Sequence, residues 1–217
     1  TTASGGTAVS NTLNRASTNL VISASWSTAD PTLAQAEFLI NGSVIGTTAI
    51  TNAASQTSVS FDFATSSQAA LQAALPAGGN VTVRLIDIAG NTIISSSSSL
   101  NVDFAAASLL IAMPVGMIIG GQTRTVTFTL SESATAGSFT SADITATNGT
   151  ISNFAGSGSL FTATFTPTAN FTGQTTIGVA GATFTDLAGN ANDAATSITG
   201  SIDTQAPTVT LNRSAAT

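Results

Sequence analysis

The chain has 217 residues and a net charge of −6, and only 6% of its residues are charged, against about a quarter in an average soluble protein. It contains no histidine, cysteine or lysine, which excludes imidazole bases, thiol nucleophiles, disulfides, ordinary zinc sites and lysine Schiff bases. Its four cations, all arginine, form no basic patch for nucleic acid, so we expect a non-catalytic protein that binds none.

Short runs of alternating apolar and polar residues recur along the chain and predict antiparallel β-strands with one solvent-exposed face. In chain order, the clearest runs cover residues 59–63, 100–104, 124–130 and 160–168. A single helical turn is expected at 67–75. The pairs Asn41-Gly42 and Asn148-Gly149 predict type I′ hairpin turns, because Asn and Gly tolerate positive φ best.

Three segments need an interpretation of their own. Residues 104–120 are apolar and uncharged, as in a transmembrane helix, but Pro114 and Gly116 interrupt them and favour an edge strand followed by a turn, so we expect no membrane insertion. Near Gly181 the apolar phase shifts by one residue, which predicts a β-bulge. Residues 1–10 have neither a basic region nor an apolar stretch, so we expect no secretion signal there.

The chain also repeats itself. Asp87–Asn91 reads DIAGN and recurs 99 positions later as DLAGN at 186–190, while TLNR at 12–15 recurs at 210–213, twice that shift. A period near 99 residues matches an immunoglobulin-like sandwich of roughly seven strands. The predicted fold is therefore all-β, with two tandem Ig-like antiparallel β-sandwiches. We place them at residues 1–103 and 104–203, with residues 204–217 as a linker and the first strand of a following repeat.

Several motifs of the second half resemble the bacterial Ig-like repeats of giant secreted adhesins of the RTX type and of biofilm-associated surface proteins. They are VTFTLSE at 126–132, FTSADIT at 139–145, NGTISNF at 148–154, FTPTAN at 165–170, FTDLAGN at 184–190 and SIDTQAP at 201–207. The first half matches less closely, because Asp103 is followed by Phe104 rather than by the family's Asp-Thr-x-x-Pro linker. The resemblance implies a secreted, monomeric rod at the bacterial surface, whose partners are neighbouring repeats and whose junctions bind calcium.

The acids cluster in this arrangement. The B–C and F–G loops of an Ig-like sandwich share one pole, where Glu132 ends the expected B strand, Asp143 lies in or just after the B–C loop, and Asp186 and Asn190 form the F–G turn. Asp103 arrives there from the linker. Because clustered carboxylates repel one another, a hard cation such as Ca²⁺, which takes six to eight oxygen ligands, would neutralise them.

The same logic extends the predicted calcium ligands to Asp30 and Asp87 in the first domain and, through the resemblance, to Asp203 at the next junction. A simpler interpretation of D-x-A-G-N stays open, because Asp, Gly and Asn form a stable turn without metal. The leading hypothesis is a calcium-rigidified spacer of a surface adhesin. The alternatives are a module that binds a glycan or host protein, and an accessory domain of a secreted hydrolase.

Overall fold

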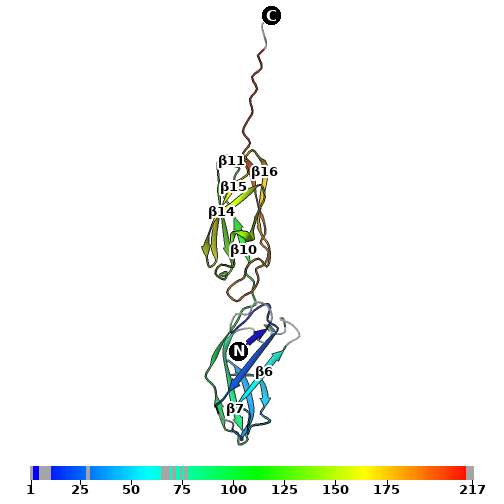
Figure 1. The fold of residues 1–217 in the computed structure, drawn as a ribbon, viewed down its shortest axis with the longest axis vertical. Helices are drawn as coiled ribbons and strands as arrows, with labels where there is room; N and C mark the ends of the chain where they lie inside the picture. The colour runs from blue at the N-terminus through cyan, green and yellow to red at the C-terminus, as the bar shows by residue number, and fades with distance from the viewer. Residues whose placement is uncertain are drawn as a thin grey trace. The chain divides into compact units, whose positions relative to one another are not determined.

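The computed structural model describes residues 2–4, 11–27, 30–64, 69, 72–73, 75 and 78–213. The chain divides into two compact units, shown with their strands in Figure 1. The first comprises Thr1–Ala105 and Ala188–Asn190, and the second Ala106–Leu187 and Ala191–Thr217.

The second unit is a sandwich of two four-stranded sheets, ordered β10-β12-β15-β14 and β11-β17-β16-β13. The first sheet contains β10 (Leu109–Ala112), β12 (Arg124–Leu130), β14 (Gly149–Ser157) and β15 (Leu160–Pro167). The second contains β11 (Ile118–Ile119), β13 (Ile144–Ala146), β16 (Thr172–Val179) and β17 (Ile198–Asp203). This order is the A-B-E-D and A′-G-F-C arrangement of an Ig-like domain.

The first unit has the same plan, with one sheet ordered β1-β3-β6 and another ordered β2-β9-β7-β4-β5. Its shorter sheet contains β1 (Thr2–Ser4), β3 (Asn19–Ser25) and β6 (Ser58–Ala64). The longer sheet contains β2 (Thr12–Leu13), β4 (Leu33–Ile40), β5 (Ser43–Ala49), β7 (Gly79–Asp87) and β9 (Ser98–Val102), and β8 (Thr92–Ile94) pairs with β7. The predicted all-β, Ig-like fold is confirmed.

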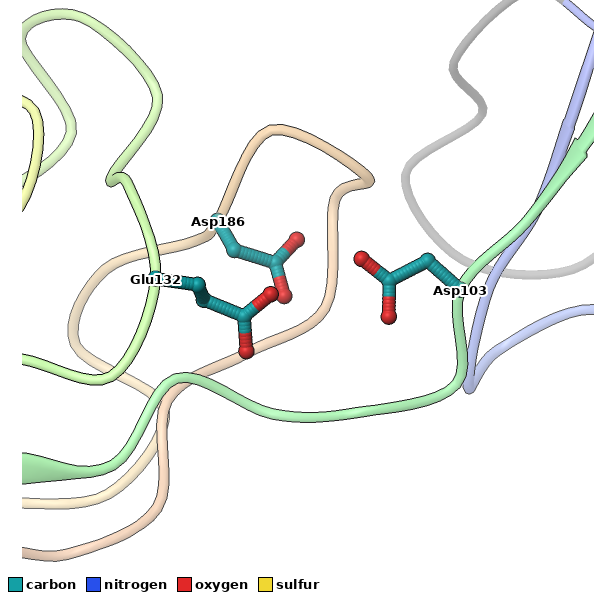
Figure 2. Close-up of side chains that lie close together, drawn as sticks. All are labelled: Asp103, Glu132 and Asp186. Carbon is teal, nitrogen blue, oxygen red and sulfur yellow. The ribbon is translucent and has the colours of Figure 1, made fainter.

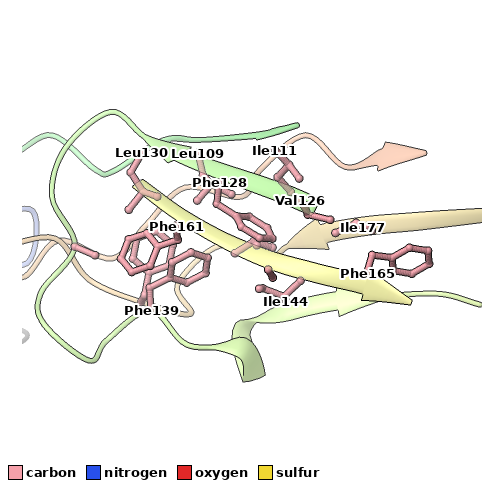
Figure 3. Close-up of a cluster of buried hydrophobic side chains, with 14 of the residues drawn as sticks. Leu109, Ile111, Val126, Phe128, Leu130, Phe139, Ile144, Phe161, Phe165 and Ile177 are labelled. Carbon is pink, nitrogen blue, oxygen red and sulfur yellow. The ribbon is translucent and has the colours of Figure 1, made fainter. Parts of the chain in front are cut away.

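The core of the second unit lies between its two sheets (Figure 3). Alternation in β12 buries Val126 and Phe128 completely, while the intervening threonines face away. At one end of this core, Phe139 from the B–C loop contacts Phe184 from the F–G loop, with ring centroids 4.7 Å apart. Aromatic pairs of this kind add about 0.5–1.5 kcal/mol beyond the area they bury, so the core itself fixes the two loops that carry the acids.

One of the two predicted hairpin turns is confirmed. Asn41 and Gly42, with φ of 51° and 81°, join β4 to β5, which pair with each other. The prediction at Asn148-Gly149 is wrong, because β13 and β14 belong to different sheets and the chain crosses between them there. Glycine is needed at position 149 for packing, since a Cβ would lie 2.3 Å from the Phe165 ring.

The predicted bulge at Gly181 is also wrong. β16 ends at Val179, and the chain turns through Ala182, whose φ is 59°. The shift in apolar phase therefore marks the start of the long F–G loop, residues 180–197 between β16 and β17.

Residues 104–120 form two short strands, β10 and β11, with a turn between them. Among the described residues, no helix has the length and apolar character needed to cross a membrane. Residues 204–213 contain no strand, so the predicted first strand of a following repeat is not formed within that described part of the chain. The expected helical turn at 67–75 lies largely outside the described residues.

Candidate functional site

At one end of the second unit, hydrogen bonds join the segment after β12 to the F–G loop. Ala134 pairs with Asp186 in an isolated antiparallel bridge, and the backbone N–H of Thr135 donates to the carbonyl of Thr185 at 2.8 Å. The hydroxyl of Thr135 also donates to the carbonyl of Asp186. The two segments are thus held together by their backbones, independently of any side-chain charge.

This pairing brings two of the predicted acids together. Carboxylate oxygens of Glu132 and Asp186 lie within 4.8 Å of one another, and Figure 2 shows the two side chains, Glu132 from the segment after β12 and Asp186 from the F–G loop. Asp186 is completely buried. Because calcium–oxygen distances are about 2.3–2.6 Å, two oxygens this close can ligate one ion.

The F–G loop is fixed by Asn192, a residue that the sequence analysis did not single out. Its side chain is 3% exposed, and its Oδ1 accepts from the backbone N–H groups of Thr183 and Phe184, both at 2.9 Å. Its Nδ2 donates to the carbonyls of Ala180 and Asp193. One buried amide therefore holds both sides of the loop that presents Asp186.

Asn190, a predicted metal ligand, makes hydrogen bonds that the sequence did not predict. Its buried side-chain amide bonds to backbone groups of the first unit, to which Ala188–Asn190 also belong. Oδ1 accepts from the Arg15 N–H at 2.6 Å, and Nδ2 donates to the Asp103 carbonyl at 3.1 Å. Asn14, a second residue not predicted, donates from Nδ2 to the Ala188 carbonyl at 2.9 Å. The amide of Asn190 thus bonds backbone groups on two segments, and its assignment as a metal ligand stays a prediction.

The two predicted junction acids form the same local turn. Asp103 Oδ1 accepts from the Ala105 N–H at 3.0 Å, and Asp203 Oδ1 accepts from the Gln205 N–H at 3.3 Å. Asp203 Oδ1 also accepts from the hydroxyl of Thr172 at 3.0 Å. The repeat found in the sequence is therefore matched by a repeated turn after the last strand of each unit.

Among the described residues, the structure does not group Asp143 with Glu132 and Asp186. Asp143 closes a 3₁₀ turn, Ser141–Asp143, and its carboxylate forms a capping box with Thr140. Oδ2 accepts from the Thr140 N–H at 2.7 Å and from its hydroxyl at 3.0 Å. The B–C loop carries Asp143 as expected, but the residue caps a helical turn instead of joining Glu132 and Asp186.

In the first unit, Asp30 and Asp87 satisfy their own turns. The hydroxyl and then the N–H of Thr32 hydrogen-bond the Asp30 carboxylate and lower its pKa. The side-chain amide of Asn91, followed by its N–H, lowers the pKa of Asp87 in the same way. Both carboxylates are thus stabilised as anions by hydrogen bonds within a few residues.

The sequence held a signal for one of the two missed asparagines. Asn14 belongs to TLNR, which recurs at 210–213, so the recurrence marked a residue of structural importance. Asn192 carries no comparable mark. Its role depends on the path of the long F–G loop, which begins after β16 ends at Val179.

Residues 103–202 match the family model of a bacterial Ig-like domain. A comparison with curated proteins finds no match. Among solved structures, the chain is similar to an ICAM-5 D1–D4 ectodomain fragment, with 14% identity and a TM-score of 0.41 over 91% of this chain and 52% of that one. The chain thus spans about half of that fragment.

Two further structures are similar. Fibronectin(III)-like modules of Clostridium thermocellum CbhA share 15% identity over 94% of this chain and 90% of theirs, with a TM-score of 0.32. The titin domains z1z2, solved in complex with telethonin, share 10% identity over 91% of this chain and 92% of theirs, with a TM-score of 0.33. Likeness at this level concerns the fold alone.

Proposed function

We propose that the chain is a non-catalytic spacer from a large, secreted bacterial surface adhesin, and that Ca²⁺ bound beside Glu132 and Asp186 stiffens the junction before the second Ig-like domain. The observation that carries this proposal is the pair of carboxylates within 4.8 Å, one of them completely buried. The match of residues 103–202 to a bacterial Ig-like domain supports an extracellular or surface module.

The pair alone provides too few ligands for calcium, which takes six to eight oxygens. The proposed third carboxylate is that of Asp103. Only Phe104 and Ala105 separate it from the second unit, so its Cα lies within about 11 Å of the Cα of Ala106.

The start of the second unit is itself held beside the acids. The N–H of Ser108 donates to Ser131 Oγ at 3.0 Å, next to Glu132, and the Ala107 carbonyl accepts from the Asp193 N–H at 3.1 Å, in the F–G loop. The linker therefore enters the second unit between the two segments that supply the acid pair. Backbone carbonyls and water would complete the shell.

Such a site acts mechanically. Interfaces between domains of one chain are small, so a bare linker of a few residues leaves neighbouring domains free to reorient. An ion held by one linker carboxylate and two loop carboxylates ties the linker to the domain. Outside the cell, where calcium is abundant, the spacer would be stiff, and it would place an adhesive tip away from the surface to support adhesion or biofilm formation.

Calcium titration by calorimetry tests the proposal. We expect one site involving Asp103, Glu132 and Asp186, with a Kd of about 0.1–1 mM, as in extracellular calcium modules. Glu132→Gln and Asp186→Asn keep the side-chain size but remove one charged ligand each, so each should weaken binding at least about tenfold, equivalent to about 1.4 kcal/mol.

Asp62→Asn is the matched control. Asp62 lies on β6 and accepts from Asn19 Nδ2 at 3.1 Å, so its loss changes the net charge without touching the proposed site. Unchanged binding in this variant, together with weakened binding in the other two, supports the assignment. No heat of binding at millimolar Ca²⁺, or equal weakening in all three variants, contradicts it.

A further inference from the structure

The two units end in the same way. In the first, the parallel pair β2–β9 closes at Leu13↔Val102, and the Ser17 N–H donates to the Asn14 carbonyl at 2.9 Å. In the second, β11–β17 contains Ile118↔Ile202, and the Gln122 N–H donates to the Ile119 carbonyl at 3.1 Å. Leu13 therefore corresponds to Ile118, Asn14 to Ile119 and Arg15 to Gly120.

The last strands correspond as well. Val102 matches Ile202 through these register pairs, and the turns closed by Asp103 Oδ1 and Asp203 Oδ1 match each other. The two units differ in how far this parallel strand pairing extends. The parallel pairing of the second unit continues to Ile119↔Asp203, whereas that of the first unit stops one pair earlier.

In the first unit, the side-chain amide of Asn190 lies at the place of that missing pair. It accepts from the Arg15 N–H and donates to the Asp103 carbonyl, the two groups that correspond to the Gly120 N–H and the Asp203 carbonyl. This end of the first unit is thus a socket for the last residue of a D-x-A-G-N turn.

The corresponding end of the second unit has a cavity of about 400 Å³. Its lining residues include Gly120, Gly121, Thr123, Pro167 and Thr204. Ile119 is 48% exposed, whereas Asn14 at the corresponding position is 1% exposed. Ile119 directly precedes Gly120, which lines the cavity, so an exposed apolar side chain adjoins this segment and provides a surface for a further partner.

We propose that this end of the second unit, formed by the Ile119–Gln122 turn and Asp203, is a docking site for the D-x-A-G-N turn of a following Ig-like repeat. The asparagine of that turn accepts from the Gly120 N–H and donates to the Asp203 carbonyl, and it takes the place of the Ile119↔Asp203 pair. The inference deepens the proposed function by naming the contact between successive repeats; it rests on the tandem arrangement and not on calcium.

The chain indicates what the occupant looks like. The turn at Asp87–Asn91 has Gly90 at a φ of 86°, as Gly189 has 85° at 186–190, so both turns bend the backbone alike. Ile88 at the tip of the first is 78% exposed. An apolar residue at this position of an incoming turn would cover Ile119. In the first unit, Asn14 at the corresponding position donates a hydrogen bond to the Ala188 carbonyl. Ile119 cannot donate this bond, and the apolar contact would replace it.

The test lengthens the chain by one repeat. Because Asp203 corresponds to Asp103, residues 108–203 are added again after Pro207, which keeps the native linker. Residues 1–207 carry the isotope label and the added copy does not, so that NMR observes Gly120 of the second unit alone. In chelator, we expect the Gly120 amide to shift and its solvent exchange to slow about tenfold relative to the original chain, equivalent to about 1.4 kcal/mol.

Variants in the added copy identify the contact. Asn190→Ala should return Gly120 to its behaviour in the original chain, and so should Asn190→Asp, which keeps an acceptor but places a carboxylate against the Asp203 carbonyl. Gln174→Ala, which removes an exposed amide, should leave the effect intact. Reversed labelling shows that each added copy is folded.

An unaltered Gly120 in the lengthened chain, or an effect that persists in both folded Asn190 variants, overturns the proposal. Because the measurement is made in chelator, a negative result here is separate from a negative calcium titration, which concerns Glu132 and Asp186.

Discussion

The two D-x-A-G-N turns of this chain share their sequence pattern and their backbone bend but differ in burial and in the distance of the segments they contact. Asp87 accepts from the Ala89 N–H at 2.9 Å and from the N–H and side chain of its own Asn91, which is exposed, at 2.8 and 2.7 Å. In the second turn, Asp186 and Asn190 are buried, and the amide of Asn190 bonds Arg15 and Asp103. The amide of the second turn thus reaches segments that lie far away in the sequence.

Burial separates the two uses of this motif. A short loop needs Asp and Asn to satisfy its own backbone groups, and Asp87 and Asn91 do this in a turn whose asparagine is exposed. In the second turn, the completely buried Asp186 lies close to Glu132, and the proposed calcium site uses this pair of carboxylates.

The largest contrast is expected at the asparagines. Asn190→Ala removes a buried amide together with its two part-buried hydrogen bonds, to the Arg15 N–H and the Asp103 carbonyl. Because one hydrogen bond contributes about 0.5–1.5 kcal/mol and an unsatisfied partner costs more, we expect a loss of about 2–4 kcal/mol in the free energy of unfolding. Asn91→Ala affects an exposed turn and should cost about 0.5 kcal/mol. Guanidinium denaturation followed by circular dichroism measures both, and equal losses would show that the two turns do not differ in role.

The next contrast concerns the aspartates and calcium. At a calcium concentration a hundred times Kd, bound ion stabilises the native protein by about 2.7 kcal/mol. Asp186→Asn should therefore lower the melting temperature in calcium and have little effect in chelator, whereas Asp87→Asn should act equally in both. Thermal unfolding in the two buffers measures this, and an equal loss for Asp186→Asn in chelator would favour a turn without metal.

The smallest contrast is in acid. Hydrogen bonds from Asn91 lower the pKa of Asp87, so this carboxylate stabilises the folded state above its ordinary pKa of about 3.9, and the contribution disappears as the pH falls through the lowered folded value. Asp87→Asn should flatten the pH dependence of unfolding below about pH 4. Trp26, the single tryptophan, lies in the first unit and reports its unfolding by fluorescence. An unchanged acid transition contradicts this role for Asp87.

Much of the fold could be predicted, because alternation with period two survives in isolated strands such as 124–130. The loops could be predicted less well than the strands. Asn148-Gly149 looks like a hairpin turn in sequence, yet the need for glycine comes from the Phe165 ring, a contact that only tertiary packing creates. The apolar shift near Gly181 likewise reflects a chain that leaves the sheet, and local pattern cannot distinguish this from a bulge.

For the candidate site, the topology was enough to place Glu132 and Asp186 at one end of a sandwich. It could not separate Asp143 from them, because the choice depends on a capping box with Thr140 that forms within the B–C loop. It also could not assign Asn190, whose partners lie 175 and 87 positions away in sequence. Side-chain partners this distant follow from packing, which composition and spacing do not encode.

Solution X-ray scattering of the whole chain in calcium and in chelator tests directly whether calcium stiffens the proposed spacer. We expect a single particle of well-defined maximum dimension in calcium, and a broader distribution of interatomic distances in chelator. We also expect Asp186→Asn in calcium to scatter like the native chain in chelator, whereas Asp62→Asn should not. Identical scattering by the native chain in both buffers would contradict stiffening by calcium.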